Sequence, residues 1–180
     1  MRVKKITELN RISITEFKQV DKLPLVIVLD NIRSLNNIGS VFRTSDAFRV
    51  QAICLCGITA TPPNAEIHKT ALGAEDSVDW RYYEKTEDAV SQLKGEGFSI
   101  CAIEQAQDSV MLDDVAKLDA MQQYALILGN EVKGVSQNVV NMCDMCIEIP
   151  QEGTKHSLNV SVAAGIVIWD FYKILKQENK

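Results

Sequence analysis

Three stretches of the chain combine glycines with small amides, hydroxyls and charged side chains, residue types that bind and position a small ligand. They are residues 36–44 (NNIGSVFRT), 129–136 (GNEVKGVS) and 150–161 (PQEGTKHSLNVS). Glycine lets the backbone approach a flat ligand closely, and backbone N–H and C=O groups can pair with the donor and acceptor on an adenine edge. The stretches therefore indicate a site for an uncharged heteroaromatic ring and a ribose.

Other nucleotide and hydrolytic chemistries find little support. The sequence has no G-x-G-x-x-G for a dinucleotide. Gly129, Gly134 and Ser136 have nearly the spacing of a phosphate-binding loop, but Val135 stands where the lysine must be and Glu131 would repel a triphosphate. There is no G-x-S-x-G, no H-E-x-x-H and only two histidines, so hydrolytic triads and zinc proteolysis are poorly supplied.

The five cysteines are expected to be structural thiols. Cys143-x-x-Cys146 could suggest redox chemistry or zinc, but a second ligand pair is missing and Cys146 begins an apolar strand. Cys54 and Cys56 alternate within a buried strand. Because the count is odd and the first residues lack a secretory apolar core, we expect a cytoplasmic protein. A thiol-dependent α/β enzyme that uses Cys143 and Cys146 stays open as an alternative.

The amino-acid composition limits the classes of protein to which the chain could belong. A chain of 180 residues that is 46% hydrophobic and 24% charged predicts one ordinary globular core. The net charge of −5 argues against coating nucleic acid by bulk electrostatics, because that mode needs excess Lys and Arg. It leaves room for a local basic site. No apolar run is long enough for a membrane span, so no membrane partner is expected.

Buried strands alternate with helices along the chain. The apolar runs predict strands over residues 25–29, 52–56, 78–83, 98–103, 125–128 and 146–149. The helical spacing predicts helices over residues 7–20, 38–48, 65–72, 86–94 and 157–176. This alternation predicts an α/β fold, a mostly parallel sheet flanked by helices. In such sheets ligands bind beyond the carboxyl ends of strands, which is where the three stretches begin.

The three stretches also carry a family resemblance. They contain Asn37-x-Gly39-x-x-x-Arg43-Thr44, then Leu128-Gly-Asn-Glu131-x-x-Gly134, then Ile149-Pro150 with Ser157-Leu-Asn-Val-Ser-Val-Ala163, and residues 69–74 (KTALGA) lie between the first two. With these segments in this order, residues 23–175 resemble the SpoU or TrmH family of the SPOUT superfamily. Members of that family are S-adenosylmethionine-dependent RNA ribose 2'-O-methyltransferases.

The resemblance implies a Rossmann-like α/β fold with a deep C-terminal trefoil knot and an antiparallel homodimer. The last predicted helix is apolar nearly all round, which is compatible with burial on most sides. We expect a methyltransferase domain over residues 23–180, preceded by a short helical extension over residues 1–22 and no N-terminal RNA-binding domain. Recognition of tRNA or rRNA would then rest on the catalytic dimer.

The resemblance also assigns roles to individual residues. The catalytic set that it implies is Arg43, Asn37, Glu131, Ser157 and Asn159. The set implied to hold S-adenosylmethionine, largely through backbone groups, is Leu128, Gly129, Asn130, Gly134, Ile149, Pro150, Ser157, Leu158 and Asn159. No metal is required, since the sulfonium already activates the methyl group. Whether Arg43 accepts the proton or stabilises the alkoxide as a cation stays open, because arginine is almost always protonated.

Simpler interpretations exist for the same residues. Arg43 could pair with Asp46 on the helix surface, Asn37 could cap the following helix, and Glu131 could be a solvated loop acid. Ser157 could likewise cap the last helix. A catalytically silent module that binds RNA or S-adenosylmethionine is the alternative function.

Cationic side chains flank the motifs and could form a local rim for RNA phosphates on this acidic chain. They are His156, Lys155, Lys133, Arg33 and Arg49. Arg49 stands where relatives often carry glycine, and Gln151 stands where relatives often carry methionine.

Overall fold

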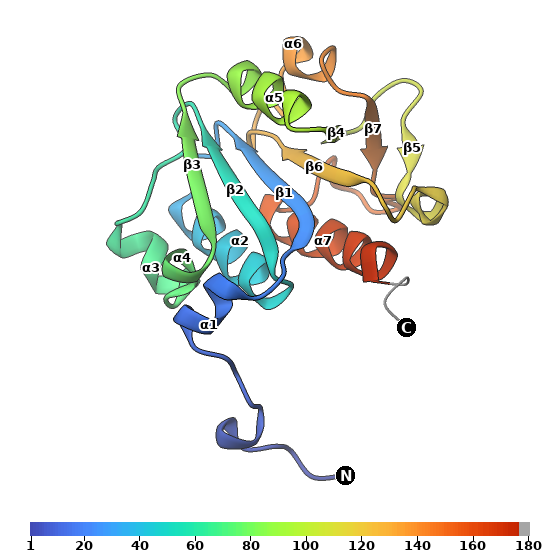
Figure 1. The fold of residues 1–180 in the computed structure, drawn as a ribbon. Coiled ribbons are helices and arrows are strands. Elements are labelled where there is room, and N and C mark those ends of the chain that lie inside the picture. Colours follow the sequence, from blue (N-terminus) through green and yellow to red (C-terminus); the bar gives the residue numbers. More distant parts are fainter. Residues whose placement is uncertain (177–180) are drawn as a thin grey trace.

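A computed structural model describes residues 1–176, the side chains of Ile6, Ala116 and Lys117 excepted. Its centre is one seven-stranded sheet with the order β3-β2-β1-β6-β4-β7-β5, in which every pairing is parallel (Figure 1). The strands are β1 (Leu23–Asp30), β2 (Val50–Cys56), β3 (Asp79–Tyr83), β4 (Phe98–Ile103), β5 (Val110–Met111), β6 (Gln123–Leu128) and β7 (Met145–Glu148). The predicted α/β class with a parallel sheet is confirmed.

Helices cover both faces of this sheet (Figure 1). They are α1 (Ile14–Gln19), α2 (Leu35–Ala47), α3 (Ala65–Ala71), α4 (Ala74–Ser77), α5 (Thr86–Gly95), α6 (Gln137–Val140) and α7 (Val160–Lys176), with 3-10 turns η1 (Ile6–Glu8) and η2 (Leu112–Lys117). In β1, Leu25, Ile27 and Leu29 join the core that includes α2 and α7. Val26 and Val28 face α5 and α6. The continuous apolar run of β1 thus reflects a strand buried on both faces.

The C-terminal part of the chain is threaded between earlier segments. β4 and β5 are consecutive in sequence, yet β7 lies between them and pairs with both. β6 lies on the other side of β4, next to β1. Since β5 belongs to the connection from β4 to β6, β7 lies between two parts of that connection, an arrangement compatible with the expected trefoil knot. Connections of this kind are rare in proteins.

Two predicted helices begin later than expected. The helix predicted over residues 7–20 forms only as α1, because Asn10 has a φ of 47° and a capping box joins Ser13 to Glu16. The last helix begins at Val160 rather than near Ser157, since the Asn159 side chain accepts the N–H groups of Ser161 and Val162 at 2.9 and 3.4 Å. The end of the predicted domain, residues 177–180, lies outside the described residues.

No helix within the described residues 1–176 is long and apolar enough to span a membrane.

Candidate active site

A cavity of about 1050 Å³ lies at the carboxyl ends of β4, β6 and β7. Its wall comes from the loop after β6, the loop after β7, the first turn of α7 and the residues that follow β4. Cavities that bind small ligands are typically about 300 to 1,000 Å³ and occur at this edge of open parallel sheets. The second and third stretches of the sequence thus line one cavity.

The loop after β6 is a closed turn. Asn130 and Gly134 exchange backbone N–H to O=C bonds of 3.1 and 2.8 Å, and Gly134 has a φ of +66°. A Cβ on Gly129 would lie 2.2 Å from both the Gly134 carbonyl carbon and the Val135 nitrogen. The Asn130 amide donates to the carbonyl of Asn31 at 2.7 Å. The two glycines therefore permit a turn that a side chain would open.

Glu131 joins this turn to the start of α2. Its carboxylate accepts the backbone N–H groups of Arg33 and Ser34, both at 3.1 Å, and the Asn37 amide at 3.3 Å. Burial raises the pKa of Glu131, but these donors lower it by more, so its pKa lies below the ordinary value. A negative charge is also favoured at a helix N-terminus. The structure therefore does not support the simpler interpretation of Glu131 as a solvated loop acid.

Asn37 connects all three stretches. Its amide donates to Glu131, and its side-chain oxygen accepts from the Asn159 amide at 3.1 Å and from the Ser161 hydroxyl at 3.4 Å. The helix cap at this point is Ser34, whose hydroxyl accepts the Asn37 N–H at 3.3 Å. Asn37 is therefore not the cap, and its side chain is free to join the start of α2 to the loops after β6 and β7.

The cavity includes most of the residues expected to hold a cofactor. Of that set, Leu128, Gly129, Asn130, Gly134, Ile149, Ser157, Leu158 and Asn159 line it. Pro150 does not, although its neighbours Ile149 and Gln151 do. Ser157 lies in the exposed loop before α7, so it is not a helix cap.

Arg43 lies apart from this cavity. It is exposed on α2, on the side away from the buried Ile38, Val41 and Phe42. Within residues 1–176 the structure gives its side chain no hydrogen bond or ion pair, and Asp46, the expected surface partner, instead accepts the Ser77 hydroxyl at 2.5 Å. A single chain therefore leaves the Arg43 guanidinium available to an outside partner.

The predicted cationic rim is only partly brought together. Lys133 and His156 line the cavity, and Arg33 stands at the start of α2 beside Glu131. Arg49 instead precedes β2 at the amino edge of the sheet, so its place in the rim is wrong. Its φ of 53° is the conformation that glycine adopts without strain.

Glu104 and Gln105, which belong to none of the sequence motifs, contact the two cavity loops. The Glu104 carboxylate accepts the Val135 N–H at 3.1 Å, and the Gln105 amide donates to the carbonyl of His156 at 3.0 Å. Both residues line the cavity. They directly follow β4, and the rule that ligands bind at carboxyl ends of strands is the signal that could have found them.

The cysteines lack the features of a reactive site. Cys54, Cys56 and Cys101 are buried, and burial raises the pKa of Cys54 and of the half-buried Cys143 to about 12. A thiol with such a pKa is protonated near neutral pH and is a weak nucleophile. Among the described residues 1–176, no group of three or more His, Cys, Asp or Glu side chains could hold a metal ion.

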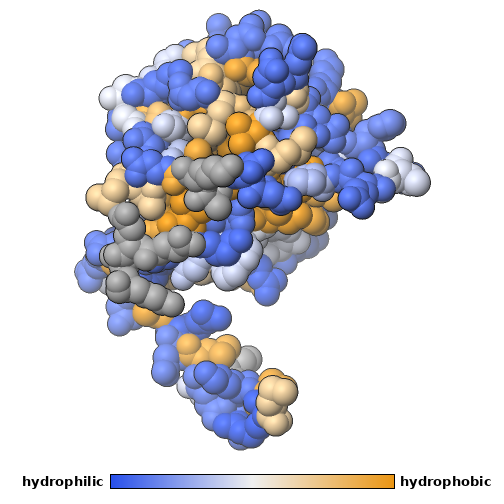
Figure 2. Space-filling model, turned by 90° about the vertical axis from the view of Figure 1, so that its right-hand side faces the viewer, coloured by the Kyte–Doolittle hydropathy of each residue, from blue (hydrophilic) through white to orange (hydrophobic). Residues whose placement is uncertain are grey.

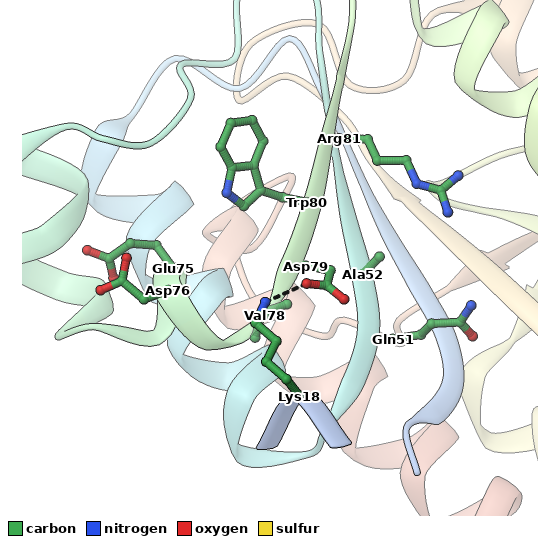
Figure 3. A pocket seen from close by; sticks show the side chains of 9 residues that line it. All are labelled: Lys18, Gln51, Ala52, Glu75, Asp76, Val78, Asp79, Trp80 and Arg81. Atoms are coloured by element: carbon green, nitrogen blue, oxygen red, sulfur yellow. Dashed lines mark hydrogen bonds and ion pairs between the residues drawn. The ribbon is translucent and has the colours of Figure 1, made fainter. Parts of the chain in front are cut away.

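A second cavity, of about 600 Å³, lies at α1, α4 and β3 (Figure 3). Trp80 and Arg81 project from β3 there, and Lys18 of α1 forms an ion pair with Asp79. None of the three motif stretches contributes to its lining. We therefore assign the candidate site to the larger cavity.

Comparison with known proteins gives a consistent result. The model of the family described as "SpoU rRNA Methylase family" matches residues 24–169. The 23S rRNA (guanosine-2'-O-)-methyltransferase RlmB of Neisseria meningitidis is 31% identical over 157 residues, which cover 86% of this chain and 61% of that relative. The chain thus spans about six tenths of the length of the curated relatives it matches.

Solved structures give the same fold. The TrmH/SpoU tRNA modifying enzyme of A. aeolicus has a TM-score of 0.79 at 25% identity, covering 92% of this chain and 83% of that one. The AdoMet-bound rRNA methyltransferase of Sinorhizobium meliloti has a TM-score of 0.78 at 25% identity, covering 88% of this chain and 60% of that one.

Proposed function

This chain belongs to the SpoU rRNA Methylase family, and on that premise we propose that it transfers a methyl group from S-adenosylmethionine to a ribose 2'-hydroxyl of tRNA or rRNA. One observation carries the proposal: the second and third family segments line one cavity at the carboxyl edge of the sheet, and Asn37 of the first segment hydrogen-bonds to both. Similarity to an rRNA 2'-O-methyltransferase and to an AdoMet-bound rRNA methyltransferase supports it.

The cavity fits the cofactor in size and in chemistry. Leu128, Ile149 and Leu158 offer apolar surface for an adenine ring, and the closed turn after β6 offers backbone N–H and C=O groups. The carboxylate of Glu104 suits the cationic groups of the ligand. Lys133, which belongs to the turn after β6, suits an anionic group of the ligand. When bound, S-adenosylmethionine supplies a methyl group already activated by its sulfonium charge.

The protein's own residues then align the substrate. Asn37 and Asn159 hold α2 and the two cavity loops in position, and Ser157 lines the cavity. Because Arg43 lies apart from the cavity of its own chain and its guanidinium is exposed and unpaired within residues 1–176, we assign it to the cavity of the second copy in the homodimer proposed below. There it would act as a cation that orients an RNA phosphate and stabilises the developing 2'-alkoxide, while the 2'-hydroxyl proton passes to water. Alignment of this kind supplies a large part of the rate enhancement in group transfer.

We further propose that the active form is a homodimer built on α7. Val162, Ile166 and Trp169 lie on one side of this helix and are 51%, 37% and 49% exposed. Trp169 packs against Phe48 and Tyr172, which enlarges the apolar surface. Apolar patches of this kind on a soluble protein mark interaction sites.

Mass-spectrometric mapping of ribose methylation in RNA from cells that lack this protein tests the proposal. We expect one or a few ribose methylations to disappear from tRNA or rRNA and to return when the gene is restored. An unchanged map would favour the catalytically silent binding module of the same fold.

A further inference from the structure

The first thirteen residues form an arm that the domain does not cover. Residues 1–5 and 7–13 are exposed, and the arm extends away from the sheet and its helices (Figure 1). Figure 2 shows the same segment below the body, with hydrophilic and hydrophobic side chains intermixed. We call residues 1–13 the N-terminal arm.

The arm has local order although it lacks a core. The Arg2 guanidinium binds both oxygens of the Glu8 carboxylate, at 2.8 and 3.1 Å, and Glu8 also accepts the Lys5 N–H at 2.6 Å. At the other end, the capping box of Ser13 and Glu16 starts α1. These contacts fold residues 2–8 into a turn.

The arm is joined to the domain through α1, which is anchored in it. Phe17 of α1 is only 5% exposed and belongs to the main core. Lys18 pairs with Asp79 at the start of β3, as Figure 3 shows. A ligand bound to the arm is therefore held at the amino edge of the sheet, the edge opposite the candidate active site.

The net charge of the arm is opposite in sign to that of the rest of the chain. It holds four cationic side chains, Arg2, Lys4, Lys5 and Arg11, against the single carboxylate of Glu8, a net charge of +3. Since the whole chain carries −5, the remaining residues carry −8. Within residues 1–176 the side chains of Lys4, Lys5 and Arg11 have no acidic partner, so three cations stay available.

From this charge and placement we propose that the N-terminal arm is an RNA-binding element, in which Lys4, Lys5 and Arg11 contact phosphates of the substrate at a distance from the methylated ribose. The inference rests on the proposed function for the identity of the substrate. Short basic segments bind nucleic acid through phosphates, which fix position without reading sequence. The arm thus supplies the local basic surface that an acidic methyltransferase needs.

The test uses the full chain with Lys4, Lys5 and Arg11 all changed to Ala. RNA affinity is measured without cofactor, by titration of fluorescent unfractionated bacterial tRNA and of a 23S rRNA transcript over a range of salt. Removing three phosphate contacts lowers the slope of log affinity against log salt by about 2 to 3, and we expect at least tenfold weaker binding near 0.15 M salt. KM for RNA should rise by the same factor as the affinity falls, and kcat should stay unchanged.

Two controls isolate the arm. The variant Lys85→Ala with Lys94→Ala removes exposed lysines of the body, away from the α7 face, and should leave the slope unchanged. The variant Val3→Ser, Leu9→Ser and Ile12→Ser keeps the arm's charge and removes its exposed apolar side chains. Circular dichroism checks that each variant is folded.

The outcomes distinguish the two proposals. An unchanged salt slope in the Lys4, Lys5 and Arg11 variant overturns the arm proposal even if methyl transfer is intact. The arm proposal is also overturned if the Val3, Leu9 and Ile12 variant changes its oligomeric state while the Lys4, Lys5 and Arg11 variant keeps its RNA affinity. The partner of the arm would then be a second copy of the chain. Absence of methyl transfer by the unaltered chain refutes the proposed activity alone, because the RNA titration needs no cofactor.

Discussion

Replacement of Glu131 by Gln should loosen the link between the turn after β6 and helix α2. In the structure the carboxylate accepts two backbone N–H groups of the helix start at 3.1 Å and the Asn37 amide at 3.3 Å. Losing one hydrogen bond costs about 0.5 to 1.5 kcal/mol, and losing a charge at a helix N-terminus costs about 0.3 to 1 kcal/mol. Because Glu131 is exposed and Gln retains one acceptor, we expect a loss of about 1 kcal/mol in unfolding free energy.

Urea unfolding at several pH values measures this loss. The pKa of Glu131 is lowered in the folded state, so its stabilisation is complete above about pH 4.5 and disappears as the pH falls through the folded pKa. The difference between the unaltered chain and Glu131→Gln should therefore be full at pH 7 and vanish in acid. Near pH 7 the melting temperature should fall by about 2 to 4 °C.

The control is Glu84→Gln, because Glu84 is an exposed acid for which the structure gives no hydrogen bond within residues 1–176. It should change stability by less than about 0.5 kcal/mol. If the Glu131 variant matched this control, or if its effect were the same at pH 7 and at pH 3, the carboxylate would not join the turn to α2.

The remaining predictions concern the cofactor turn, the proposed catalytic cation and the dimer. Gly129→Ala should weaken S-adenosylhomocysteine binding in calorimetry at least tenfold, since the added Cβ would lie 2.2 Å from backbone atoms of the turn. Gly153→Ala is the control and should bind normally, because its Cβ would have nothing within 4 Å. Equal affinities of the two variants would refute the closed-turn argument. Arg43→Ala should abolish methyl transfer with cofactor affinity nearly unchanged, and unchanged turnover on the true RNA would remove Arg43 from the mechanism. Ile166→Asp should convert a dimer to monomers in analytical ultracentrifugation, and an unaltered mass would exclude the α7 face as the interface.

The sequence predicted the sheet well because both-face burial leaves a strong pattern. Leu25–Leu29 and Ala52–Cys56 are continuous apolar runs, and each lies within a strand of the structure. β5 escaped prediction because its two residues, Val110 and Met111, are exposed and too short to show a period. The placement of β7 between β4 and β5 has no local signal at all, since it depends on the path of the whole chain.

The site was predictable to the extent that its residues belong to motifs. Asn37, Glu131 and Asn159 are found together through direct hydrogen bonds, as their shared family pattern suggests. Glu104 and Gln105 were missed because their role is visible only in what they contact: one backbone N–H at Val135 and one carbonyl at His156. The catalytic role of Arg43 stays a prediction, because one chain contains neither the RNA nor a second copy.

The most direct test of the central claim is transfer of labelled methyl groups in vitro. Purified protein is incubated with S-adenosylmethionine carrying a tritiated methyl group and with RNA from cells that lack the protein, and the RNA is then hydrolysed with alkali. A ribose 2'-O-methyl group blocks cleavage at its own linkage, so the account predicts label in alkali-resistant dinucleotides, and none with Arg43→Ala. Label in mononucleotides, or no incorporation by the unaltered protein, would contradict it.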